Sequence, residues 1–410
     1  MLIVLGCSMR ILFVAMANSV HTARWINQIA DQGWDIHLFP SLNSDIHPEL
    51  RNLAIHDRLV RSANSGKNVN QVGSLPWPFP GSVNLANKVL SRLLRVESAP
   101  WTVGRTQRLA RWIDKLKPDI IHSLEMQQAG YLTLEAKKIY RSKFPPWIMS
   151  IWGSDLYLFN RLADHVGKIR DVLSACDYFS AECQRDLNLA RTLGFQKEML
   201  PCLPMFGGFD LDTLRRLWQP GPISARRLIV LKGYQGWAGR SLVGLRALEL
   251  CADKLKEYRI AIPLANEDVK LSAELMSGRT GIPVDIIPPC SNMEILKLHG
   301  RARTSIGLSI SDGLPASFAE SFVMGSFPIQ SCTSCADEWI EDGKTGLIVP
   351  PEDPEPIAAA IRRALSEDDL VDRAAELNAR TARERLDYRL IQPQVIAMYE
   401  KVAAKSGHIR

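Results

Sequence analysis

Two carboxylates, Asp312 and Glu320, bracket the predicted start of a helix. Before them, apolar residues alternate over 306–310, which is typical of a strand, and Pro315 suits a first helical turn. The free amides at a helix N-terminus bind anions, and a carboxylate accepts hydrogen bonds from a vicinal diol. One short strand–turn–helix element could therefore hold a phosphate and a sugar, although a solvated helix start is the alternative.

A glycine-rich loop carries two cations, Lys232 and Arg240, after the predicted strand 227–231 and before a helix that begins at Ser241. Glycines such as Gly233 let backbone amides approach a diphosphate, and the cations neutralise its charge. This loop is a weak signal by itself, but together with the stretch around Asp312 it indicates a phosphate-bearing ligand.

Buried strands alternate with helices in two successive runs, separated by a stretch rich in Pro and Gly around 201–222. This alternation predicts an α/β protein with two Rossmann-like domains of parallel strands. We expect an N-terminal domain at 1–205, a linker at 206–220 and a second domain at 221–388.

The composition describes a soluble globular protein with 410 residues, 46% hydrophobic content and a net charge of +6. No apolar run reaches the length of a membrane span, and Arg10 splits the one N-terminal run that resembles a signal peptide. Met9 is an alternative start to Met1. The lone pair Cys332 and Cys335 gives weak support for zinc or redox chemistry, so we expect no metal.

The stretch from Asp312 to Pro328 resembles the Glu-x7-Glu motif of the retaining GT-B glycosyltransferases, family four of that class. It keeps the spacing, the glycine, the second glutamate and the G-x-P ending, and it departs at Asp312, where the family has Glu. Further similarities cover nearly the whole chain and lie at 118–122, 152–155, 207–210 and 342–354. At 152 the family's usual histidine is replaced by Trp152.

The resemblance implies GT-B architecture, with the two parallel sheets facing a central cleft and a last helix, 389–410, crossing back to the first domain. It implies retaining transfer from a nucleotide-diphosphate sugar without a metal or other cofactor, the leaving phosphate taking the acceptor proton. Asp312 would hold the transferred sugar, Glu320 the ribose, and Lys232 and Arg240 the diphosphate. The full set is Asp312, His122 and Asp155 as catalytic residues; Glu320, Arg240, Lys232, Gly233, Gly313, Leu314 and Ser317 for the donor; Ser291 and Asn292 for the base; and Asn18, Ser19, His21 and Trp152 for the acceptor.

The expected partners are a nucleotide sugar and a glycan or lipid-linked acceptor in cell-surface polysaccharide synthesis, with no nucleic acid. The basic, apolar-interleaved stretch 85–117 predicts a cytoplasmic protein that contacts an anionic membrane, and a solvated helix face is the alternative. A nucleotide-sugar epimerase of the same fold and a non-catalytic binding partner in glycan assembly are alternative functions. For His122, backbone hydrogen bonding near the strand end is the alternative to catalysis.

Overall fold

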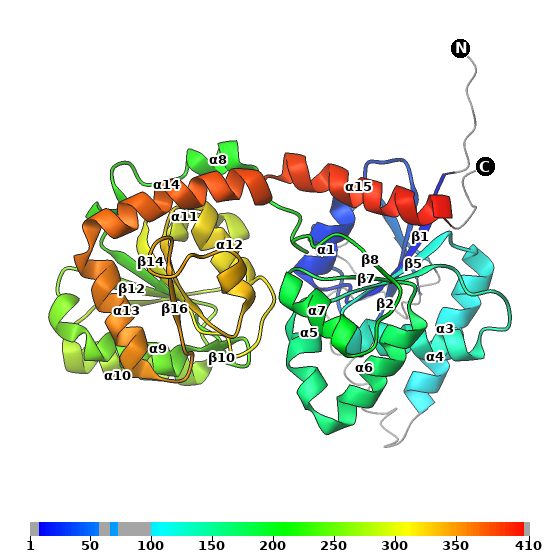
Figure 1. The fold of residues 1–410 in the computed structure, drawn as a ribbon, viewed down its shortest axis with the longest axis horizontal. Coiled ribbons are helices and arrows are strands. Elements are labelled where there is room, and N and C mark those ends of the chain that lie inside the picture. Colours follow the sequence, from blue (N-terminus) through cyan, green and yellow to red (C-terminus); the bar gives the residue numbers. More distant parts are fainter. Residues whose placement is uncertain (1–7, 57–65, 73–99, 406–410) are drawn as a thin grey trace, which may run out of the picture. The chain divides into compact units, whose positions relative to one another are not determined.

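The computed structural model describes residues 8–56, 66–72 and 100–405. The chain divides into two compact units. The first contains residues up to Gly207 together with the chain from Gln392 onward, and the second is Gly208–Ile391. Each unit has its own parallel sheet and its own hydrophobic core, so each is described separately (Figure 1).

The sheet of the first unit has the strand order β4-β3-β2-β1-β5-β6-β7-β8, and neighbouring strands are parallel. Its strand order reverses between β1 and β5, where open α/β sheets commonly bind ligands. The strands are β1 (Arg10–Ala15), β2 (Asp35–Pro40), β3 (Leu53–Ile55), β4 (Val69–Gln71), β5 (Ile120–Leu124), β6 (Trp147–Ser150), β7 (Tyr178–Ser180) and β8 (Glu198–Met199).

Helices flank this sheet and bury its continuous apolar strands, as expected where parallel strands are covered on both faces (Figure 1). Their bounds are α1 (Val20–Asn27), α3 (Pro100–Leu116), η2 (Met126–Gly130), α4 (Tyr131–Ile139), α5 (Ser154–Tyr157), η3 (Phe159–Arg161), α6 (Ala163–Ala175) and α7 (Gln184–Thr192). The final helix, α15 (Tyr388–Lys405), begins in the second unit, and its residues from Gln392 belong to the first.

The sheet of the second unit has the order β13-β12-β9-β14-β15-β16, and all of its pairs are parallel. The order reverses between β9 and β14. The strands are β9 (Leu228–Leu231), β12 (Arg259–Pro263), β13 (Val284–Ile287), β14 (Ala302–Gly307), β15 (Phe327–Ser331) and β16 (Leu347–Val349). A separate antiparallel hairpin joins β10 (Gln235–Gly236) to β11 (Gly239–Arg240).

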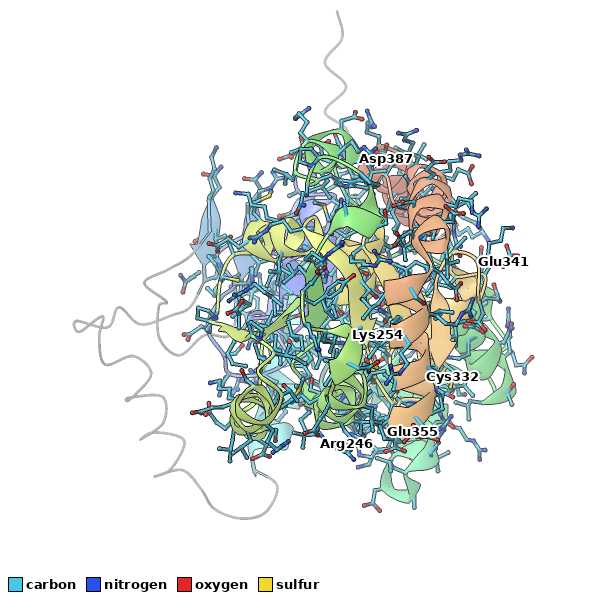
Figure 2. All side chains as sticks on the ribbon, turned by 90° about the vertical axis from the view of Figure 1, so that its left-hand side faces the viewer. Arg246, Lys254, Cys332, Glu341, Glu355 and Asp387 are labelled. Carbon is cyan, nitrogen blue, oxygen red and sulfur yellow. The ribbon has the colours of Figure 1, made fainter. Side chains whose placement is uncertain are left out.

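The helices of the second unit bury apolar faces against its sheet and expose charged ones. Arg246 on α9, Lys254 on η5 and Glu355 on α13 are exposed and labelled in Figure 2. The bounds are α8 (Leu211–Arg215), η4 (Ile223–Ala225), α9 (Ser241–Leu250), η5 (Ala252–Lys254), α10 (Glu267–Thr280), α11 (Asn292–His299), α12 (Ala316–Val323), η6 (Cys335–Glu338), α13 (Pro354–Ser366) and α14 (Asp368–Arg385).

The prediction of two Rossmann-like domains with parallel sheets is confirmed. Two strand ends differ from the expectation. β14 stops at Gly307 rather than Ile310, so 308–312 form a loop, and β5 runs two residues beyond His122. Among the described residues, no helix is long and apolar enough to cross a membrane.

Candidate functional site

In the second unit, Lys232 and Asp312 meet where the strand order reverses. Lys232 directly follows β9, and Asp312 lies in the loop after β14, the neighbouring strand. The Lys232 Nζ lies 3.5 Å from the Asp312 Oδ2 and 3.4 Å from the Ser309 Oγ. Both charged side chains are largely shielded from solvent, with exposed fractions of 11% and 21%. Two of the predicted residues, far apart in sequence, therefore share one position in the fold.

The predicted helix between Asp312 and Glu320 is α12, which begins at Ala316 after Pro315. Pro315 supplies no side-chain cap, so the first amides of α12 are not covered by the residue before it. The Gly313 amide donates to the Asp312 Oδ1 at 3.1 Å, which helps to hold that side chain at the start of the turn. Leu314, which precedes the helix, is buried, and Ser317 in the first turn of α12 is half-buried.

Glu320 occupies the second turn of α12 and is only 6% exposed. The Asn292 Nδ2 donates to its Oε1 at 2.5 Å. Asn292 and Ser291 were predicted to contact a base. In the structure Asn292 contacts Glu320, and the Ser291 side chain caps α11 in a reciprocal capping box with Glu294. The contact with a base stays a prediction.

The β10–β11 hairpin is fastened to the loop that carries Asp312. The Trp237 carbonyl accepts from the Ile310 amide at 2.9 Å, and the Ser309 Oγ donates to the Ala238 carbonyl at 3.0 Å. Trp237 is 53% exposed, and Tyr234 is 37% exposed. Sequence reasoning missed these two aromatic residues, although aromatic side chains in a glycine-rich loop were the available signal.

Gly233 and Arg240 flank the hairpin. A Cβ at Gly233 would lie 2.4 Å from the Pro263 carbonyl oxygen, so the close approach of the two chain segments requires glycine. The Arg240 Nε donates to the Glu352 Oε1 at 3.1 Å, and the Arg240 Nη1 donates to the Gly236 carbonyl. Arg240 therefore pairs with an exposed carboxylate, and any anionic ligand would compete with Glu352 for it.

In the first unit, Asp155 joins two loops at the carboxyl edge of the sheet. Its Oδ2 accepts from the Met126 amide at 3.0 Å after β5, and its Oδ1 accepts from the Trp152 amide at 2.9 Å after β6. Burial raises the pKa of the Asp155 carboxyl well above its usual range, and the neighbouring Glu125 charge raises it further. Asp155 thus fixes the backbone around Trp152.

Glu125 follows β5 and was not predicted. Its φ of 83° is rare for a residue with a side chain, and its carboxylate accepts from the Gln127 and Gln128 amides at 2.7 Å each. Burial raises its pKa. A carboxylate shortly after a predicted buried strand was the sequence signal that could have found it, because open α/β sheets bind ligands at the carboxyl ends of their strands.

The predicted acceptor-side residues Asn18, Ser19 and His21 follow β1 at the same edge of the first sheet. Asn18 is exposed, and the Ser19 Oγ caps α1 by accepting from the His21 amide at 3.2 Å. The rings of His21 and Trp152 lie 5.3 Å apart, so the structure brings these two predicted residues together.

His122 is placed differently from the expectation. It lies within β5 rather than at its end, in register with Phe13 and Ile148, and its side chain is fully buried. Its Nδ1 is 2.6 Å from the Tyr399 hydroxyl and its Nε2 is 2.7 Å from the Ser150 hydroxyl. Burial lowers the pKa of His122 to about 3. A ring held in the core by two hydroxyls favours a structural role for His122, although its partners are side-chain hydroxyls and not the backbone groups expected.

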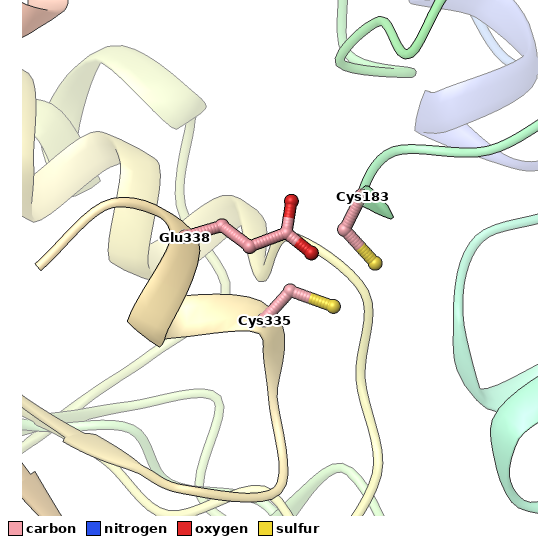
Figure 3. Close-up of side chains that lie close together, drawn as sticks. All are labelled: Cys183, Cys335 and Glu338. Carbon is pink, nitrogen blue, oxygen red and sulfur yellow. The ribbon is translucent and has the colours of Figure 1, made fainter. Parts of the chain in front are cut away.

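The two cysteines of the lone C-x-x-C motif differ in their surroundings. Cys332 is an exposed free thiol at the end of β15, whereas Cys335 is buried and lies on η6 with Glu338 (Figure 3). The Cys335 amide donates to the Gly313 carbonyl at 3.0 Å, so η6 supports the turn that precedes α12.

Two family models match the sequence. The one described as glycosyl transferase 4-like covers residues 10–68 and 91–174, and the one described as glycosyl transferases group 1 covers 266–382. No curated protein sequence matches significantly.

Several solved structures share the fold. Sucrose-phosphate synthase from Thermosynechococcus elongatus has a TM-score of 0.67 at 14% identity, covering 97% of this chain and all of that one. HepE from Anabaena, solved in complex with UDP, has a TM-score of 0.64 at 13% identity, covering 96% and 100%. A UDP-forming trehalose-phosphate synthase from Burkholderia vietnamiensis has a TM-score of 0.66 at 11% identity, covering 98% and 99%.

Proposed function

Because the chain belongs to the GT-B glycosyltransferases of the family-four type, we propose that it transfers a sugar from a nucleotide-diphosphate sugar with retention of configuration. The acceptor is a glycan or lipid-linked saccharide of cell-surface polysaccharide synthesis. The observation that carries the proposal is the arrangement around α12: the Lys232–Asp312 pair lies before its N-terminus and the buried Glu320 lies in its second turn. HepE, a structural relative, has been solved with UDP-glucose.

The proposed roles follow from charge and position. The Lys232 ammonium and the amides at the start of α12 stabilise the negative charge that develops on the leaving diphosphate. Arg240 joins them after exchanging Glu352 for phosphate oxygens. Glu320 accepts hydrogen bonds from the ribose hydroxyls, and Asp312 accepts them from the transferred sugar. No residue in this scheme requires a metal, and the leaving phosphate accepts the acceptor proton.

In the first unit, the proposed acceptor surface consists of Asn18, His21 and Trp152 at the carboxyl edge of the sheet. The indole nitrogen of Trp152 is a hydrogen-bond donor group and its ring is a flat apolar face, which together suit a sugar ring. Asp155 positions this residue through the backbone. His122 has no part in the proposed chemistry, because its ring lies in the core.

The proposed location is the cytoplasmic face of an anionic membrane. This rests on the basic stretch 85–117, of which residues 85–99 lie outside the described residues. The described part, α3, carries Arg105, Arg108, Arg111 and Lys115. Binding to anionic vesicles that weakens as salt rises supports this location, and no binding at low salt excludes it.

The experiment that tests the proposed function measures nucleoside diphosphate release and the anomeric configuration of the product. The protein is first screened by thermal shift against UDP, GDP and ADP and their sugars, because a ligand that binds only the native state stabilises it. Transfer to a saccharide acceptor with retention supports the proposal. Epimerised donor without transfer indicates an epimerase, and binding without either reaction indicates a non-catalytic partner.

A further inference from the structure

Glu320 is a buried carboxylate that contacts Asn292, a residue of a different helix. Glu320 lies on α12, Asn292 is the first residue of α11, and the Asn292 Nδ2 donates to the Glu320 Oε1 at 2.5 Å. A buried carboxylate is stable only when its oxygens accept hydrogen bonds. A hydrogen bond from an amide to an ionised carboxylate is also stronger than one between neutral groups.

The start of α11 is built so that Asn292 is not needed as its cap. Ser291 occupies the capping position: its Oγ accepts from the Glu294 amide at 3.3 Å, and the Glu294 Oε2 accepts from the Ser291 amide at 2.8 Å. Asparagine is a common capping residue, yet here it stands one position later, with its side chain directed to α12. The backbone around Asn292 is therefore anchored independently of its contact with Glu320.

We propose that Asn292 is a positioning residue that fixes the rotamer of Glu320 for binding the ribose of the donor. This inference rests on the proposed function of α12. The amide is suited to the task because it donates without bringing charge. A carboxylate at the same position would repel Glu320 when both are ionised, and an alanine would leave the Glu320 side chain unrestrained on this side. Asn292 thus acts through Glu320 and not on the base.

The test compares Asn292→Ala and Asn292→Asp with the unchanged protein. The probe is whichever of UDP, GDP and ADP binds most tightly, because the ribose is common to all three. Its dissociation constant is measured by calorimetry from pH 5 to pH 8. Met293→Asp is the matched control, since it adds the same charge at the neighbouring, exposed position of α11. Glu320→Ala tests the site itself, and thermal unfolding checks that each variant folds.

We expect Asn292→Ala to bind about tenfold more weakly at every pH, as for one lost hydrogen bond to a charged group. Asn292→Asp should bind more weakly as pH rises, because at low pH one of the two carboxyls is protonated and donates to the other. Met293→Asp should follow the unchanged protein. If Glu320→Ala weakens binding but neither Asn292 variant does, the inference is wrong while the site stands. If Glu320→Ala binds normally, or no nucleotide binds, both fail.

Discussion

Lys232 and Asp312 are separated by 79 intervening residues, yet their charged groups lie 3.5 Å apart at the reversal of strand order in the second sheet. Each residue comes directly from the carboxyl end of its strand or from the loop that follows it. The Lys232 ammonium therefore lies beside the loop that leads into α12. An anion bound there would be attracted by the ammonium and by the free amides at the start of the helix. This pairing gives the proposed site a cation that is already held in place.

Replacing Asp312 tests its proposed role in holding the transferred sugar. Asp312→Asn keeps the size of the side chain but removes the charge that pairs with Lys232. We expect turnover to fall by at least about tenfold while the affinity for the free nucleoside diphosphate changes little, because the lost contact is made to the sugar. Steady-state kinetics and calorimetry measure the two quantities. Equal losses in both would assign Asp312 to the diphosphate instead.

Glu320 should determine donor affinity more than stability. Glu320→Ala should lose about 1.5–3 kcal/mol of nucleotide binding, the range for hydrogen bonds to charged groups. The unliganded protein should unfold at nearly the same temperature, because the half-buried Asn292 left behind can bond to water. The control is Glu274→Ala, which removes an exposed carboxylate from α10. An unchanged affinity for donor would remove Glu320 from the site.

Gly233 should tolerate no side chain. In Gly233→Ala the new Cβ would meet the Pro263 carbonyl oxygen at 2.4 Å and Ala265 at 2.7 Å, so the loop after β9 must shift. We expect weaker nucleotide binding and a lower unfolding temperature. Gly278→Ala is the matched control, because its Cβ meets nothing within 4 Å, and alanine favours a helix by about 0.8–1.0 kcal/mol. Equal behaviour of the two variants would contradict the steric argument.

His122 should contribute to stability and not to the chemical step. His122→Ala leaves the buried hydroxyls of Tyr399 and Ser150 without their ring partner and opens a cavity in the core. We expect the free energy of unfolding to fall by about 1–3 kcal/mol. The turnover number per folded molecule should stay close to that of the unchanged protein. A large loss of turnover in a variant that unfolds normally would return His122 to the catalytic site.

The buried pair His37 and His56 should make the free energy of unfolding depend on pH. The His37 Nδ1 lies 2.9 Å from the His56 Nε2, and the His37 Nε2 lies 3.0 Å from the Asp35 Oδ1. Burial lowers the pKa of both, to about 4 for His56, and the positive charges of Arg10 and Lys115 act in the same direction, while Asp35 opposes them.

The pKa of His56 is lower in the folded protein than in the unfolded chain. At pH values between these two pKa values, His56 takes up a proton when the protein unfolds. The contribution of neutral, buried His56 to the free energy of unfolding is fully present above about pH 6.5, and it is lost as pH falls toward about 4. Denaturant titrations at several pH values should show this loss, and His56→Gln should make the curve shallower between these limits. Parallel curves for the two proteins would rule out the contribution of His56.

The sequence by itself determined the two-domain α/β architecture and the elements of the proposed donor site. Apolar strands such as 228–231 must be covered on both faces, and Asp312, Pro315 and Glu320 mark a helix start at fixed spacing, so these are local signals. Lys232 was predicted to bind the diphosphate because it lies in a glycine-rich loop directly after a predicted strand, which is also a local signal. Such features do not depend on which distant segment packs beside them.

Only the tertiary structure decided which side chains meet. Strand order brings Lys232 to Asp312, and the packing of α11 beside α12 brings Asn292 to Glu320, a contact that the sequence did not predict. The length of β5 decided that His122 lies in the core, because two further residues pair with β6 before the strand ends. Register and helix packing depend on contacts between segments far apart in the chain, and no local pattern records them.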